Sequence, residues 1–292
     1  MSIDVELALD ARASLGEGPV WDPRTNLLYW VSIRAGEVHE FDPASGSDRV
    51  IKLGKDIGCI ALRETTGAVV ALQDGFAELD LSTGELAYIA NPEQGRDDIL
   101  FNDGKCDPFG RFWAGTKAYA DTPGAGALYC MDVNRSISLK VPSVTISNGL
   151  AWSADARRMY YIDTLAAEVS VFDYDLATGE IGNRRTAVSI PQELGYPDGM
   201  AIDCEGKLWV ALWGGRCVAR FDPDTGDCLE KIPMPVTCPS SCCFGGPDLD
   251  ELYITSASIE LTEAERAAEP IAGGLFRAKP GVRGCPPAYF RG

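Results

Sequence analysis

The sequence predicts an all-β fold, a six-bladed β-propeller whose blades are four-stranded antiparallel sheets. Two observations support this prediction. Short runs rich in aromatic and β-branched residues, bounded by Gly, Pro and Asp, recur along the chain, as expected for strands joined by tight turns. These runs form six units of about 40–50 residues, the repeat length of a propeller blade. With 292 residues and 46% apolar content, residues 1–292 are expected to form one domain with a large closed core.

The first unit shows the pattern that the others repeat. Residues 18–21 are expected as the innermost strand, residues 27–31 as an aromatic-rich second strand, and residues 38–41 as a third. The stretch 42–46, Asp-Pro-Ala-Ser-Gly, is typical of a turn, because Asp accepts amide hydrogen bonds there and Gly tolerates a positive φ.

The other five units contain equivalent runs and turns. The expected strands are residues 60–62 and 68–72 in unit two, 111–116 and 127–132 in unit three, 150–152, 159–164 and 169–173 in unit four, 200–203, 207–211 and 218–222 in unit five, and 243–244, 251–255 and 274–277 in unit six. Residues before Val20 or after Leu275 are expected to supply a strand that closes the ring between the first and last units.

One short helix interrupts this pattern. Thr262 and Glu265 have the spacing of a capping box, in which each side chain caps the backbone amide of the other. Pro270 ends the helix, because proline cannot continue the backbone hydrogen bonding. We interpret residues 262–269 as an insertion within unit six.

Composition excludes several kinds of partner. The formal charge is −17 with no basic patch, so nucleic acid and anionic membranes are not expected as partners. Residues 1–6 lack the basic segment of a signal peptide, and no apolar run is long enough to span a membrane, so a cytoplasmic location is expected. The ten cysteines form no Cys-x-x-Cys pair and are expected as free thiols in the core. We expect a small-molecule partner and a monomer or weak oligomer.

Four short phrases place a carboxylate or carboxamide beside a glycine, roughly one per blade repeat. In each phrase the acidic or amide residue stands five positions before the residue that opens the next turn. These residues are Glu17, Asn102, Asn148 and Asp198, followed by turn residues at 22, 107, 153 and 203. Equivalent register on the innermost strands predicts that the four side chains surround one mouth of the central channel.

Two carboxylates and two carboxamides facing one axis would repel each other or stay unsatisfied unless a cation lies between them. The sequence therefore predicts one divalent cation, Ca²⁺, Mg²⁺, Mn²⁺ or Zn²⁺, and oxygen donors favour the first three. Three protein ligands would leave positions for water and substrate. The simpler alternative is that these residues cap strands or bind channel water, since Asn-Gly and Asp-Gly are ordinary turn dipeptides. Four of them at matched register favour the metal site.

The chain resembles the SMP-30/gluconolactonase/regucalcin family, and its sugar lactonase members in particular, from about Leu15 to Arg277. The motifs that carry the resemblance are residues 15–21, 102–105 with 115–116, 147–153, 196–199, 213–215 and 243–248. The resemblance implies a six-bladed propeller with one divalent cation at the channel mouth. It also implies that the enzyme hydrolyses aldonolactones to aldonic acids. By motif match, Glu17, Asn148 and Asp198 correspond to metal ligands and Asn102 to a substrate-binding residue.

The chain departs from the family at one position. Family members often carry an arginine that contacts substrate two residues before the Asn of the Asn-Asp-Gly motif, where this chain has Leu100. Arg96 lies nearby in the sequence, but its spacing does not assign it the same role. The departure bears on sugar specificity more than on the chemistry.

Within this resemblance, the metal would polarise the lactone carbonyl and Asp198 would act as the catalytic residue that orients or deprotonates the attacking water. Two alternatives remain: a divalent-cation-binding propeller without catalysis, and a hydrolase of a non-sugar lactone or ester, favoured if Leu100 makes the rim less polar. His39 is the single histidine, which excludes a two-histidine base, and no Gly-x-Ser-x-Gly elbow is present.

Overall fold

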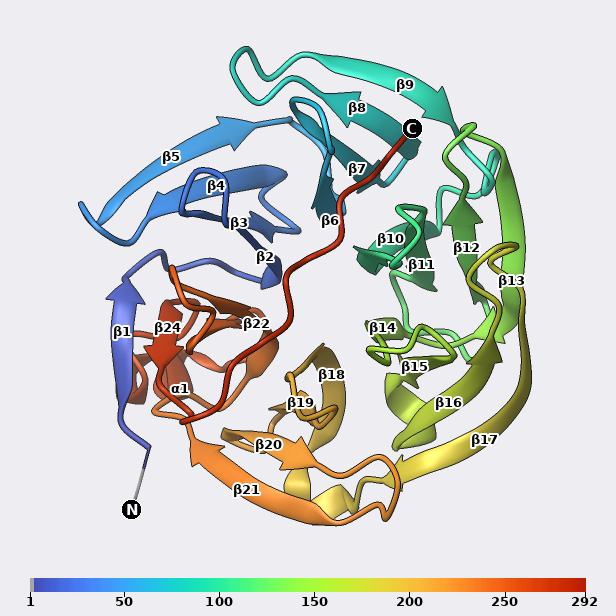
Figure 1. Cartoon of the computed structure of the whole chain (residues 1–292). Helices are drawn as coiled ribbons and strands as arrows, with labels where there is room; N and C mark the ends of the chain where they lie inside the picture. Colours follow the sequence, from blue (N-terminus) through green and yellow to red (C-terminus); the bar gives the residue numbers. More distant parts are fainter. Residues whose placement is uncertain (1–2) are drawn as a thin grey trace.

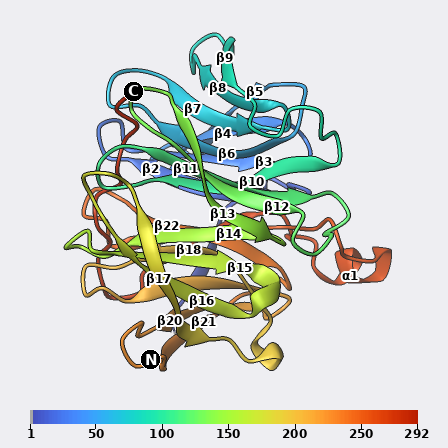
Figure 2. The same ribbon diagram turned by 90° about the vertical axis from the view of Figure 1, so that its right-hand side faces the viewer.

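Six four-stranded antiparallel sheets stand in a ring around a central channel in the computed structural model, which describes residues 3–292 (Figure 1). This arrangement confirms the predicted six-bladed β-propeller. Figure 2 shows the ring from the side, where the one α-helix of these residues projects from the body of the molecule. Met1 and Ser2, which belong to the predicted domain and N-terminal segment, lie outside the described residues.

Five blades are built from consecutive strands, innermost strand first. They are β2 (Gly16–Asp22), β3 (Leu27–Ser32), β4 (Glu37–Asp42) and β5 (Ser47–Lys52); β6 (Ile57–Leu62), β7 (Ala68–Leu72), β8 (Gly75–Leu79) and β9 (Leu86–Ala90); β10 (Ile99–Cys106), β11 (Phe112–Ala118), β12 (Gly126–Met131) and β13 (Ile137–Val144); β14 (Ser147–Trp152), β15 (Arg158–Asp163), β16 (Glu168–Tyr174) and β17 (Ile181–Ser189); and β18 (Tyr196–Ile202), β19 (Leu208–Trp213), β20 (Cys217–Phe221) and β21 (Cys228–Pro233).

The sixth blade joins the two ends of the chain. It contains β22 (Pro239–Gly245), β23 (Glu251–Ser256), β24 (Leu275–Ala278) and, as its outermost strand, β1 (Val5–Leu9), which pairs antiparallel with β24. The expected closing strand therefore comes from the residues before Val20.

Residues after β24 do not close the ring. Instead, residues 284–291 cross its face, bridging Gly284 to Asp203 and Phe290 to Arg63 (red in Figure 1). Pro286 and Pro287 lie in this segment and lack the amide hydrogen that a sheet requires.

The core lies between neighbouring blades, because both faces of each inner and second strand are covered. This is why β7 and β19 read as nearly continuous apolar runs, with alternate residues packing against opposite neighbours. All ten cysteines are free and most are buried, as expected.

The predicted helix is α1 (Glu263–Ala268), between β23 and β24, and its capping box is formed by Thr262 and Glu265. Two 3₁₀ turns, η1 (Thr164–Ala166) and η2 (Gln192–Leu194), complete the elements. Within residues 3–292, no helix is long and apolar enough to cross a membrane.

Buried turn aspartates join each turn to the strands beside it. Asp107 accepts hydrogen bonds from the backbone amides of residues 109–111, from the Trp113 indole at 2.9 Å and from the Tyr174 hydroxyl of the next blade at 2.7 Å. Asp203 does the same for its own turn and for the second-strand tryptophan of blade five. The turn role predicted from sequence is confirmed, and the structure adds a link between blades.

We expect Asp107→Asn to lower the free energy of unfolding by about 3 kcal/mol or more, because it removes a buried charge from partners that stay buried. Asp80→Asn is a matched control, since Asp80 is an exposed turn aspartate bonded only within its own turn. Urea denaturation of both variants measures the difference. Equal losses would show that Asp107 is no more than another turn residue.

Candidate metal centre at the channel mouth

Each of the four predicted side chains lies on an innermost strand, Glu17 on β2, Asn102 on β10, Asn148 on β14 and Asp198 on β18. All four are buried, with between 3% and 6% of their surface exposed. Neighbouring innermost strands pack against one another around the ring. The structure therefore places the four residues at equivalent positions around one channel.

An irregularity in strand pairing recurs at these positions. In all four blades the register between the innermost and second strands shifts within the predicted phrase, at Glu17/Val20, Phe101/Gly104, Ser147/Leu150 and Pro197/Met200. A bulge of this kind bends a strand locally and re-aims its side chains. The glycine of each phrase lies within or at the end of this irregularity, and the innermost strands of the other two blades carry a similar one, at Ile57/Cys59 and Pro239/Ser241.

Two of these glycines also allow neighbouring strands to approach closely. A Cβ atom on Gly199 would lie 2.0 Å from Ser241 Oγ, and one on Gly149 would lie 2.9 Å from the Asp198 carbonyl oxygen. Neither distance leaves room for a side chain. The Xaa-Gly phrases therefore serve packing between blades as well as the site.

Hydrogen bonds fix the two carboxamides. Asn102 Nδ2 donates to Asn148 Oδ1 at 3.0 Å and to the Ser147 carbonyl at 2.8 Å. Asn148 Nδ2 donates in turn to Thr164 Oγ1 at 2.8 Å. These bonds use both N–H groups of Asn102, so its remaining polar atom, Oδ1, can only accept hydrogen bonds.

The carboxyl groups affect one another across the channel. Burial raises the pKa of Glu17 well above its ordinary value, and the charges of Asp198 and Asp103 raise it further. Burial likewise raises the pKa of Asp198 well above its ordinary value, with the charge of Asp103 as the next cause. Ionising all three in this buried place is unfavourable unless a positive charge balances them.

Two further residues belong to this electrostatic environment and were not identified from sequence. Asp103 is buried, and its pKa is raised by that burial. Its position inside the Asn-Asp-Gly phrase was the signal that could have identified it. Lys117 lies in β11 directly opposite Leu100, and its ammonium lowers the pKa of both Glu17 and Asp198. Cross-strand register determines this placement, and no local pattern reports it.

The expectation that Leu100 makes the rim less polar stays a prediction. Leu100 is 4% exposed and packs in a core cluster with residues of the first two blades, such as Ile33 and Ile57. Arg96 does not take the place of the missing arginine. Its guanidinium is held by Glu93, Asp98 and the Ala125 carbonyl.

We expect Gly199→Ala to lower the free energy of unfolding by about 1–3 kcal/mol, because the added methyl group overlaps Ser241. Gly182→Ala in β17 is the matched control, since a Cβ there meets no atom within 4 Å, and it should be neutral or slightly stabilising. Thermal denaturation of both variants tests this. A stable Gly199→Ala protein would contradict the close packing of β18 against β22.

Comparisons with known proteins agree with this architecture. The protein-family model described as the SMP-30/Gluconolactonase/LRE-like region matches residues 15–258 of the sequence. Regucalcin from Gallus gallus is 41% identical over 297 residues, covering 100% of this chain and 99% of the relative. YvrE from Bacillus subtilis (strain 168), named as a proposed sugar lactone lactonase, is 39% identical over 290 residues, covering 99% of each chain.

A solved structure is similar over the same length. The crystal structure of a calcium-binding protein, regucalcin, from Agrobacterium tumefaciens has a TM-score of 0.95 at 28% identity, covering 100% of this chain and 98% of that one. These matches span the region in which the sequence motifs carry the family resemblance. The chain belongs to the SMP-30/gluconolactonase/LRE-like family.

Proposed function

We propose that the protein is a metal-dependent lactonase that hydrolyses a sugar-derived lactone, an aldonolactone, to the aldonic acid. The observation that carries the proposal is the group of buried carboxyl groups, Glu17, Asp103 and Asp198, within electrostatic reach at one channel mouth. Membership of a family that includes gluconolactonases supports it, as does the similarity to a proposed sugar lactone lactonase.

Glu17, Asn148 and Asp198 would hold one divalent cation. Within residues 3–292, no three His, Cys, Asp or Glu side chains group closely enough to hold a metal ion by themselves. An amide oxygen such as Asn148 Oδ1, together with water, is therefore needed to complete the ligands. All these donors are oxygen atoms, which suits Ca²⁺, Mg²⁺ or Mn²⁺. When bound, the cation supplies a Lewis acid for the lactone carbonyl.

The chain's own residues supply the remaining steps. Asp198 takes the proton of the attacking water, because its carboxylate would lie beside the cation and the water that it binds. The water oxygen bonds to the acyl carbon, the acyl carbon–oxygen bond of the ring breaks, and the ring oxygen takes the proton from Asp198 and leaves as a hydroxyl group. Asn102 Oδ1 accepts a hydrogen bond from a substrate hydroxyl, because its amide hydrogens are already used. The Lys117 ammonium adds positive charge beside the carboxyls.

A panel of five- and six-carbon aldonolactones, with and without a chelator, tests the function. We expect at least one of them to open faster than it does spontaneously, and the acceleration to disappear with chelator and return with added metal. The titration of released acid measures it. No acceleration with any lactone, when metal is supplied and shown to bind, would favour the cation-binding propeller without catalysis. Faster opening of apolar lactones alone would favour the non-sugar hydrolase.

We expect Asp198→Asn to reduce lactone turnover by about 100-fold or more, because it removes the base. Asp224→Asn is a control on the same blade, since Asp224 is exposed and pairs with Arg158 in the neighbouring blade. Metal binding is measured in parallel by calorimetry. Near-normal turnover by Asp198→Asn with metal still bound would reject the base assignment.

A further inference from the structure

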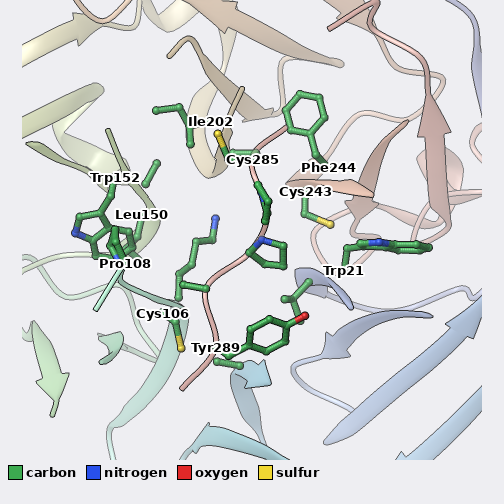
Figure 3. A pocket seen from close by; sticks show the side chains of 18 of the residues that line it. Trp21, Cys106, Pro108, Leu150, Trp152, Ile202, Cys243, Phe244, Cys285 and Tyr289 are labelled. Atoms are coloured by element: carbon green, nitrogen blue, oxygen red, sulfur yellow. The ribbon is translucent and has the colours of Figure 1, made fainter. Parts of the chain in front are cut away.

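A cavity lies toward the end of the channel opposite the acidic mouth. Its volume is about 510 Å³, a size typical of small-molecule binding sites. The innermost strands begin near the acidic mouth and run toward this end, so Trp21, Cys106 and Trp152 line it from the last part of their strands (Figure 3). None of the four predicted site residues lines it.

The wall of this cavity is mostly apolar and aromatic. Figure 3 shows the side chains of Trp21, Leu150, Trp152, Ile202 and Phe244 around it. They come from four different blades, so the enclosure exists only in the closed ring. A surface of this kind binds the apolar part of a ligand better than it binds a sugar.

One positive charge interrupts the apolar wall. Lys105 stands two residues before its turn aspartate, where the first, fourth and fifth blades have Val20, Ala151 and Ala201. Its ammonium donates one hydrogen bond, at 2.7 Å, to the Met200 carbonyl. Within the described part of the chain, no carboxylate lies at ion-pair distance from it, which leaves two N–H donors without a protein acceptor.

The other charged residues of the cavity wall neutralise each other. Arg291 Nε lies 3.4 Å from Glu64 Oε1, and both residues are largely exposed. Lys105 is therefore the charge that an incoming ligand meets inside the cavity. A half-buried ammonium with free donors favours an anion that can accept charge-assisted hydrogen bonds.

The C-terminal segment bounds the mouth of the cavity. Gly284 donates to the Leu249 carbonyl and Phe290 to the Leu62 carbonyl, both at 2.8 Å, so residues 285–289 span the opening between two fixed points. Tyr289 is held by a hydrogen bond to Asp22. Figure 1 shows this segment across the centre of the ring, so the opening is fixed by packing at both ends of the segment.

We propose that this cavity is a second binding site, for an amphipathic carboxylate. The carboxylate accepts hydrogen bonds from Lys105 Nζ, and the apolar part packs against Val20, Trp152 and Phe244. A neutral apolar ligand would leave the ammonium donors unsatisfied, and a sugar would leave the aromatic walls without apolar contact. The site does not depend on the lactonase function, because it uses none of the residues assigned to that reaction.

Decanoate is a suitable probe, titrated into the full-length protein in the presence of chelator so that the carboxylate cannot act through bound metal. We expect saturable binding of one molecule by calorimetry, with a change in tryptophan fluorescence because Trp152 lines the cavity. Decanol, which has the same tail without the charge, should bind at least about tenfold more weakly. Absence of saturable decanoate binding would overturn the proposal.

Two variants locate the binding. Lys105→Met should bring decanoate binding down to the level of decanol, and Val20→Phe should weaken both ligands about tenfold by filling the cavity from another blade. Thermal denaturation identifies the variants that fold, and Val20→Phe carries the test if Lys105→Met does not. Unchanged binding in the folded variants would overturn the proposal. So would decanoate inhibiting lactone hydrolysis competitively, because that would place it at the acidic mouth.

Discussion

Mutual repulsion among buried carboxyl groups is the constraint on which this molecule depends. Closure of the ring through β1 and β24 brings the starts of the innermost strands to one mouth, although Glu17 and Asp198 are far apart in the sequence. Once buried there, each carboxyl makes ionisation of the others less favourable. A cation bound between these carboxyl groups would offset their mutual repulsion. The fold that buries them and the proposed metal chemistry are therefore linked.

The turn aspartates differ from the carboxyl groups at the mouth, because they have many hydrogen-bond donors around them. Asp107, which follows β10 at the end away from the mouth, is fully buried and is surrounded by amide, indole and hydroxyl donors. Asp203 repeats the arrangement in blade five. At the mouth, by contrast, Glu17 and Asp103 each accept a hydrogen bond from the amide of the following glycine, so the turn aspartates are surrounded by more donors than the mouth carboxyls are.

The two ends of the channel also differ in chemical character although the same strands form both. Polar residues at the bulges face one mouth, and apolar residues such as Leu150 and Phe244 face the cavity beyond it. Lys105 lies between them, since its charge lowers the pKa of Asp103 while its side chain lines the cavity. The same innermost strands therefore form a polar channel mouth and a mostly apolar cavity.

The sequence by itself determined most of the inner and middle strands, the turns, the capping box of Thr262 and Glu265, and the common spacing of Glu17, Asn102, Asn148 and Asp198. Each of these depends on residues close together in the chain, whose alternation and turn chemistry can be read directly. Only the tertiary structure decided that β1 closes the ring, that Leu100 is buried and that Lys117 lies beside the acid groups. These depend on cross-strand register and on packing between blades, which bring together residues that no local pattern relates.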